Sequence, residues 1–197
     1  MKLPRINYGC ECCGRELAKN ATICGECLNH PTPFTHTIAP FHYAEPIDKF
    51  IIALKFHGQL LYAKLLGELL AERLIEYYKN TAEPEIIIPI PLHTQRLKER
   101  GFNQALEIAK PIAKKLQLPL ERYHCQRVKN TAAQTTLTAK ERRHNVKQAF
   151  GVNKKLPEHV AVIDDVITTG STMTEFCKTL KKSGTIIIDV WCCARSR

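Results

Sequence analysis

The sequence predicts an α/β fold, a mostly parallel sheet flanked by helices, with a small four-cysteine module at its N-terminal side. Short apolar runs alternate with helical patterns from residue 85 onward, an order that gives parallel strands joined through helices. Two amphipathic segments precede that alternation, over 46–79. Cysteines are dense only at the start, before residue 28. We therefore expect a cysteine module at 1–38 and a main domain at 39–197.

Composition and charge limit the classes of function. The 197 residues are 44% hydrophobic and 24% charged, and the formal net charge is +10. A basic chain suits anionic partners such as nucleic acid, phosphorylated metabolites or anionic lipid. The sequence has no apolar core of signal-peptide length and no stretch near the ~20 apolar residues of a membrane span. We therefore expect a cytoplasmic protein with no membrane span.

The cysteine module contains two CxxC pairs separated by ten residues. Two such pairs can complete a tetrahedral shell of four sulfur atoms around a structural zinc ion. The four ligands are predicted to be Cys10, Cys13, Cys24 and Cys27. Cys12 is then a bystander, and Gly14 and Gly25 provide permissive backbone. The alternatives are buried thiols, a redox CxxC, or His30 or His36 in place of one cysteine. The segment is too polar to bury so many thiols. It also lacks the strand followed by a helix that a redox CxxC needs.

The elements of the main domain follow from hydrophobic periodicity. "PIDKFIIALKFHG" has apolar residues at helical spacing and ends at Gly58, and a helix of about five turns follows to residue 79. These two helices either pack beside the sheet or join the cysteine module as a lid. The later elements are strands at 85–91, 121–128, 159–166 and 185–194, and helices at 103–118 and 172–183. Thr138 and Glu141 form a capping box that predicts one further short helix.

The stretch "VAVIDDVITTGST" carries the candidate ligand site. Asp164 and Asp165 come at the end of an apolar run, and carboxylates there favour sugar hydroxyls or a divalent cation. The turn that follows offers backbone amides, hydroxyls and a helix N-terminus to a phosphate. Its residues are Thr168, Thr169, Gly170, Ser171 and Thr172. A ribose 5-phosphate carrying magnesium fits this set, whereas an ordinary strand-to-helix turn needs only one Asp and one Thr.

These residues resemble the signature of type I phosphoribosyltransferases, in which two acids hold the ribose of phosphoribosyl pyrophosphate and the loop holds its 5-phosphate. Two more stretches, 88–105 and 134–150, together with the cysteine module, resemble the ComF family. The resemblance implies magnesium with phosphoribosyl pyrophosphate, and a pyrophosphate loop at Leu92 and His93. Arg96 and Arg100 are suited to add charge there. The family resemblance also implies that the segment 129–137 closes over the ligand. Three motif residues that follow this loop either contact ligand or DNA or form a solvated basic helix face; they are Arg142, Arg143 and Asn145.

Three functions remain open at this point. The first is a phosphoribosyltransferase acting on an unnamed acceptor, with Asp164 and Asp165 as its catalytic pair, holding the ribose while C1 gains positive character. The second is a protein of natural transformation that receives single-stranded DNA after uptake, which the family resemblance implies and the positive charge supports. The third is a sensor that binds the ligand without turnover. The resemblance also suggests a competence helicase-like ATPase and a DNA-processing protein as partners.

Overall fold

The computed structural model describes residues 2–129 and 148–196. Its helices are α1 (Gly25–Asn29), α2 (Ile47–His57), α3 (Leu61–Tyr78), α4 (Thr94–Arg100), α5 (Gln104–Leu116) and α7 (Ser171–Lys182). Its strands are β1 (His36–Ile38), β2 (Phe41–His42), β3 (Ile86–Pro89), β4 (Cys125–Arg127), β5 (Phe150–Val152), β6 (His159–Ile167) and β7 (Ile187–Arg195). The capping box and the three motif residues at 142–145 lie outside the described residues, as does nearly all of the loop at 129–137.

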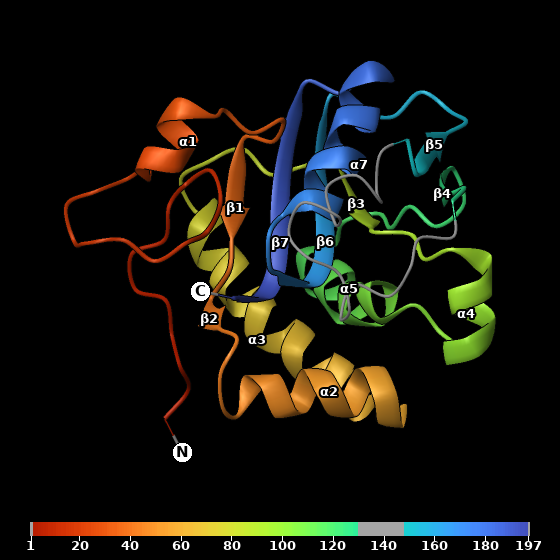
Figure 1. Cartoon of the computed structure of the whole chain (residues 1–197), viewed down its shortest axis with the longest axis horizontal. Helices are drawn as coiled ribbons and strands as arrows, with labels where there is room; N and C mark the ends of the chain where they lie inside the picture. The colour runs from red at the N-terminus through yellow and green to blue at the C-terminus, as the bar shows by residue number, and fades with distance from the viewer. Residues whose placement is uncertain (1, 130–147, 197) are drawn as a thin grey trace.

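The main sheet is parallel throughout, as the sequence predicts. Its strand order is β1-β7-β6-β3, and β2 pairs with β7 beyond the end of β1. β6 and β7 form its centre, with Ile163 opposite Trp191 (Figure 1). The fold class expected from the sequence is therefore confirmed.

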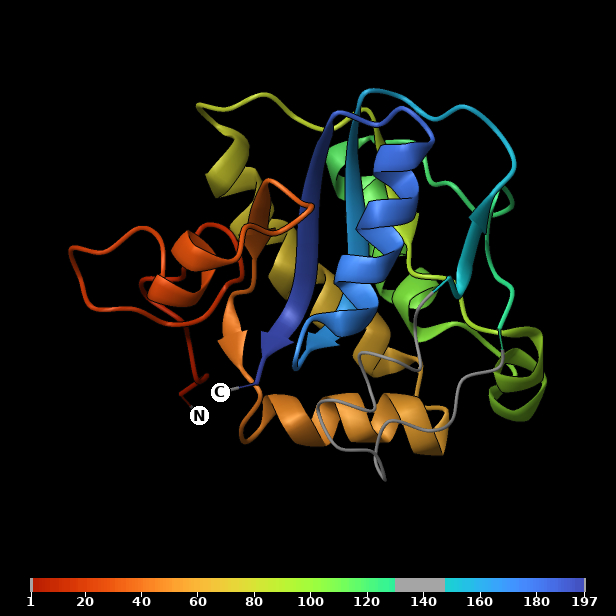
Figure 2. The ribbon, with the colours of Figure 1, turned by 45° about the horizontal axis from the view of Figure 1, so that its top comes forward.

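Helices cover both faces of this sheet. α3 and α5 lie behind it and α7 lies in front (Figure 2). The strands alternate accordingly, because successive side chains point to opposite faces: Val160 and Val162 of β6 belong to the core under α7, whereas Ala161 and Ile163 belong to the core under α3 and α5. This alternation gives the protein two apolar cores, one on each side of the sheet.

The two N-terminal helices of the main domain pack beside the sheet and form no lid with the cysteine module. α3 contributes Leu66, Leu70 and Leu74 to the same core as α5. α2 runs across the carboxyl ends of β6 and β7 (Figure 2). Of the two arrangements left open by the sequence, the structure adopts the first, with α2 next to the predicted ligand site.

The strand predicted at 121–128 is present as β4, but it lies outside the main sheet. It pairs antiparallel with β5 in a separate two-stranded ribbon. Phe150 of that ribbon packs against Phe176 of α7, with ring centroids 4.9 Å apart. No sequence pattern predicted β1, β2 or α4, because these elements are short and proline or polar residues surround them. Among the described helices, none has the length and apolar character needed to cross a membrane.

Asp189 of β7 fixes the amino edge of the sheet. Its carboxylate is buried and accepts hydrogen bonds from the Tyr78 hydroxyl at 2.6 Å and His159 Nε2 at 2.9 Å. His36 Nδ1 lies 3.0 Å from its other oxygen, so His36 serves this network and not the cysteine cluster. The carboxylate thereby joins the end of α3 to strands β1, β6 and β7, and the ligand site lies at the opposite edge.

Candidate functional site

Asp164 and Asp165 lie where β6 loses one of its two neighbours. β3 pairs with β6 only as far as Pro89 opposite Ile163, whereas β7 accompanies β6 to Ile167. Ligands of open α/β sheets bind at the carboxyl edge, where neighbouring strands diverge. The position of the two acids in the fold is therefore the one expected for a ligand site.

The two carboxyl groups have opposite pKa shifts. Burial, together with the adjacent charge of Asp165, raises the pKa of Asp164 well above its usual range. Burial would also raise the pKa of Asp165, but the positive charge of Lys55 and hydrogen bonds from Asp164, Lys55 and the Val166 backbone together outweigh it and lower this pKa. The pair thus combines one carboxylate that stays ionised with one carboxyl that holds its proton to a higher pH.

Lys55 is the site residue that the sequence did not reveal. It lies on α2, and its ammonium group forms an ion pair with the Asp165 carboxylate. Two further cations act on the acids: Arg100 on both, and Arg127 of β4 on Asp164. Lys55 and Arg127 come from segments distant in sequence, and no motif spacing connects either to "DD"; only the fold brings them there.

The phosphate loop predicted after β6 has the expected backbone. Gly170 adopts a left-handed conformation, with φ 73°, which glycine reaches without strain, and it is the N-cap of α7. Thr168 and Thr169 are exposed, and the Thr169 hydroxyl lies 2.8 Å from that of Ser171. The loop therefore presents hydroxyl groups beside the N-terminus of a twelve-residue helix, where an anion is favoured.

The turn after β3 contacts β4, whose Arg127 acts on Asp164. Leu92 and His93 lead into α4, and His93 Nδ1 accepts a hydrogen bond from Gln95 N–H, capping that helix. His93 also forms an isolated parallel bridge with Arg127. Arg96 pairs loosely with Glu99 at 3.6 Å, and Arg100 donates a hydrogen bond to Gln104. Of the two predicted arginines, Arg100 is the one whose charge acts on the acids.

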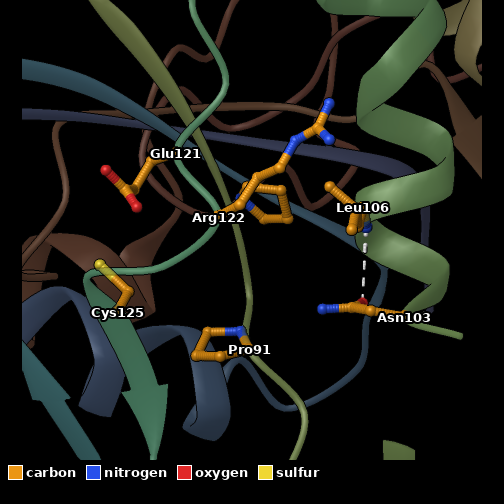
Figure 3. Close-up of a pocket in the computed structure, with 7 residues that line it drawn as sticks. Pro91, Asn103, Leu106, Glu121, Arg122 and Cys125 are labelled. Atoms are coloured by element: carbon orange, nitrogen blue, oxygen red, sulfur yellow. Dashed lines mark hydrogen bonds between the residues drawn. The ribbon is translucent and has the colours of Figure 1, made fainter.

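A small hollow lies beside this turn, between the start of α5 and the segment before β4 (Figure 3). Two of its polar side chains form hydrogen bonds within the chain: Asn103 caps α5 and donates to the Ile90 carbonyl at 2.9 Å. Glu121 accepts from the backbone N–H groups of Tyr123 and His124. These hydrogen bonds therefore fix the position of the chain where it leaves β3, and with it the turn at 91–93.

The four predicted cysteines converge in the N-terminal module. The Sγ atoms of Cys10, Cys13, Cys24 and Cys27 all lie within 4.8 Å of one another, an arrangement that could hold a metal ion. Burial would raise the pKa of the Cys24 thiol, but hydrogen bonds, chiefly from Cys27, outweigh it and lower this pKa to about 7. Gly14 has φ 69° and lies against Thr37. The role predicted for Gly25 is wrong, because it simply begins α1 and has no positive φ.

Fold and site together define an α/β protein with an acid pair and a phosphate-type loop at the carboxyl edge of a parallel sheet. The chain is 38% identical over 193 residues to Competence protein F of Haemophilus influenzae, covering 95% of this chain and 84% of that protein. It is 32% identical over 190 residues to DNA utilization protein YhgH of Escherichia coli K12, with the same coverage. The chain therefore belongs to the family of these proteins, the ComF family.

Other comparisons are more distant. Competence protein ComFC of Streptococcus pneumoniae is 27% identical over 146 residues, which cover 74% of this chain and 62% of that protein. Among solved structures, the purine phosphoribosyltransferase of Pyrococcus horikoshii is 19% identical with a TM-score of 0.39, covering 68% of this chain and 73% of that one. The scan against protein-family models found no match.

Proposed function

We propose that this protein binds phosphoribosyl pyrophosphate with magnesium at the carboxyl edge of β6, and acts on single-stranded DNA during its uptake. The observation that carries the first part is the acid pair, which lies directly before the phosphate-type loop with Lys55 and Arg100 acting on it. Carboxylates accept hydrogen bonds from the ribose diol, and the loop amides and hydroxyls donate to the 5-phosphate. The cations and magnesium would neutralise the pyrophosphate.

Family membership supports the second part. The relatives are named for competence and for DNA utilization, and a formal charge of +10 favours a polyanionic partner. A helicase-like ATPase and a DNA-processing protein are the partners that this role would require in the cytoplasm.

Zinc is the metal that the cysteine cluster fits best. A tetrahedral zinc site with Zn–S bonds of about 2.3 Å has sulfur atoms about 3.8 Å apart, and Cys13 Sγ lies 3.7 Å from Cys24 Sγ. Four thiolates leave no open coordination position, so the ion would hold the module together and take no part in a reaction. Cys10→Ser should then abolish stoichiometric zinc, as measured by elemental analysis of the purified protein.

A transferase reaction is the second candidate function. Arg100 and Arg127 act on the acid pair, and guanidinium groups suit the charge of a departing pyrophosphate. In that reaction Asp164 and Asp165 would hold the ribose hydroxyls while the bond from C1 to pyrophosphate breaks. A sensor would use the same contacts without breaking the bond, and pyrophosphate release in the presence of candidate acceptors distinguishes the two.

Titration calorimetry tests the proposed ligand. The zinc-loaded protein is titrated with phosphoribosyl pyrophosphate and magnesium, with and without a single-stranded oligonucleotide. We expect saturable binding that weakens at least about tenfold in the double variant Asp164→Asn with Asp165→Asn. Asp48→Asn, an acid at the start of α2 outside the site, is the matched control. Unchanged affinity in the double variant would overturn the assignment of the acids, and absence of binding in the wild type would overturn the ligand.

A further inference from the structure

Arg195, at the end of β7, connects the cysteine module to the phosphate loop. Its side chain is buried, with 6% exposed. Nε donates to the Cys13 carbonyl at 2.9 Å, and Nη1 donates to the carbonyls of Ile167, at 3.0 Å, and Thr168. One guanidinium group therefore bonds to the backbone of a predicted metal ligand and to the two residues that lead into the loop.

The backbone places Arg195 for this contact. In the β6–β7 ladder Arg195 is the partner of Ile167, the last residue of β6. The main chain reinforces the junction, because Ser196 N–H donates to the Ile167 carbonyl at 2.9 Å. The start of the phosphate loop is thus held at the end of β7 by both the Ser196 backbone and the Arg195 guanidinium group.

The cysteine module is also docked firmly on β1. The Thr37 hydroxyl donates to the Cys12 carbonyl at 2.7 Å, and Thr37 N–H donates to the Glu11 carbonyl at 2.7 Å. A Cβ at Gly14 would lie only 2.9 Å from Thr37 Cγ2, so the Gly14 backbone packs closely against the Thr37 side chain. Any rearrangement of the turn that contains Cys13 would therefore change the geometry offered to Arg195.

The charge of a metal-bearing cysteine cluster would act on the guanidinium group of Arg195. A divalent ion with four thiolates has a net charge of −2, and a guanidinium group close to it is stabilised. Among the described residues Arg195 has no ion pair with a carboxylate; backbone carbonyls accept its hydrogen bonds, and the charge of a metal-bearing cluster would add to their stabilisation of the guanidinium group. Without the metal, the Cys13 turn loses the constraint that fixes one end of this bridge.

We infer that Arg195 is a positioning residue through which metal in the four-cysteine cluster orders residues 168–171 of the phosphate loop. The inference rests on the proposed function for its ligand but not for the ordering of the loop itself. Coupling of two sites is reciprocal: if metal tightens phosphoribosyl binding by some factor, the ligand tightens metal binding by the same factor. If the hydrogen bonds of Arg195 are lost, metal no longer changes the phosphoribosyl affinity and the coupling factor becomes one. Each site still keeps the residues that bind its own ligand.

The first experiment needs no phosphoribosyl ligand. Amide hydrogen exchange is measured on the zinc-loaded and the chelated full-length protein. In the wild type, metal removal should speed exchange at 167–171 at least about fivefold. In Arg195→Lys, which keeps the charge but cannot reach the module and the loop together, exchange there should be fast with or without metal. Arg15→Gln is the matched control, because Arg15 belongs to the same module but pairs with Glu26.

The second experiment measures the coupling factor. Calorimetry gives the affinity for phosphoribosyl pyrophosphate with and without zinc, and chelator competition gives the zinc affinity with and without that ligand. We expect a shared factor of about five or more, in the usual range for coupled sites, in the wild type and in Arg15→Gln. In Arg195→Lys the factor should fall to about one while zinc content stays full.

The outcomes separate the two proposals. If zinc-loaded protein binds no phosphoribosyl pyrophosphate but metal still slows exchange at 167–171 through Arg195, the proposed ligand is wrong and the coupling holds. If the ligand binds with equal affinity in the presence and absence of metal, or if Arg195→Lys keeps the coupling, the inference is overturned and the proposed function stands.

Discussion

At the scale of single residues, the acid pair is asymmetric because Lys55 reaches only one of its members. The side chain of Lys55 is 24% exposed and that of Asp165 is 3% exposed, so their ion pair is largely shielded from water. Among the described residues Asp164 forms no ion pair, and burial beside a second acid raises its pKa. Substitutions of two adjacent aspartates by asparagine should therefore have opposite effects on stability.

Asp165→Asn should destabilise the protein. It leaves the Lys55 ammonium group in a mostly buried position without its counter-charge, which costs about 3 kcal/mol, the low end for a broken buried pair because Lys55 keeps some solvent contact. The lowered pKa of Asp165 means that its contribution is present above the unfolded-state pKa of about 3.9 and is lost as pH falls through the folded pKa. Urea unfolding at pH 7 and pH 3.5 tests this: a cost that does not shrink at the lower pH would contradict it.

Asp164→Asn should stabilise the protein, increasingly so as pH rises. A raised folded-state pKa means that the stability contributed by the protonated Asp164 is complete below about pH 3.9 and is lost as pH rises through the folded pKa. Asparagine cannot ionise, so the variant does not lose this stability as pH rises. The difference in Tm between Asp164→Asn and the wild type should therefore grow between pH 4 and pH 8. A difference that is constant over this range would show that Asp164 titrates normally.

Residue-scale sequence reasoning could propose the acids and the loop as a site because their chemistry is contiguous along the chain. It could not identify Lys55, which in "ALKFHG" looks like any lysine on the polar side of an amphipathic helix. It also could not identify Arg195, whose guanidinium group is buried by contacts with three segments, around Cys13, Ile167 and Ser196. Both residues act through partners far away in sequence, and no local pattern encodes such pairs.

At the scale of elements, the packing of α3 on α5 depends on one glycine. A Cβ at Gly67 would lie 2.5 Å from the Ile108 carbonyl oxygen and 2.5 Å from Pro111 Cγ. Neither atom belongs to a flexible side chain that could move aside. Glycine in a helix interior normally costs about 1 kcal/mol relative to alanine, and here the close approach of the two helices requires it.

Gly67→Ala should therefore destabilise the protein despite the better helix propensity of alanine. Overpacking at such a contact costs about 3 kcal/mol of stability, and the better helix propensity of alanine offsets about 1 kcal/mol of it. The net loss of about 2 kcal/mol corresponds to a fall in Tm of about 4–8 °C for a chain of this size. Gly151→Ala is the control, because its Cβ would meet Val128 Cγ1 at an ordinary 3.7 Å. Equal Tm values for the two variants would show that the helices can separate without cost.

Elements with a strong period were predictable, and those defined by their partners were not. Apolar runs gave β3, β6 and β7, and periodic leucines gave α3. β1 has three residues and β2 has two, and each is a strand only because β7 pairs with it. β4 was recognisable as a strand, but its polar residues gave no indication that it pairs with β5 away from the main sheet.

At the scale of the whole molecule, the boundary predicted at residue 38 passes through shared structure. β1, at His36–Ile38, is the edge strand of the main sheet, and Ile6 N–H donates to the Pro40 carbonyl at 2.9 Å. Glu16 lies 3.0 Å from His42 of β2. A division into two units stays a prediction, and these contacts lead us to expect that the cysteine module and the sheet unfold together.

Chelation tests that expectation because the chain has one tryptophan, buried Trp191 in β7, which reports on the main sheet. If the metal-bearing module and the sheet form one cooperative unit, removing the metal should lower the Tm seen by Trp191 fluorescence. A loss of about 3 kcal/mol corresponds to about 6–12 °C. In cobalt-loaded protein, the thiolate-to-metal absorbance and the Trp191 signal should change at the same temperature. If the absorbance is lost first and Trp191 then melts at the temperature of the chelated protein, the module unfolds independently, and its contacts through β1 and Arg195 are too weak to couple it to the sheet.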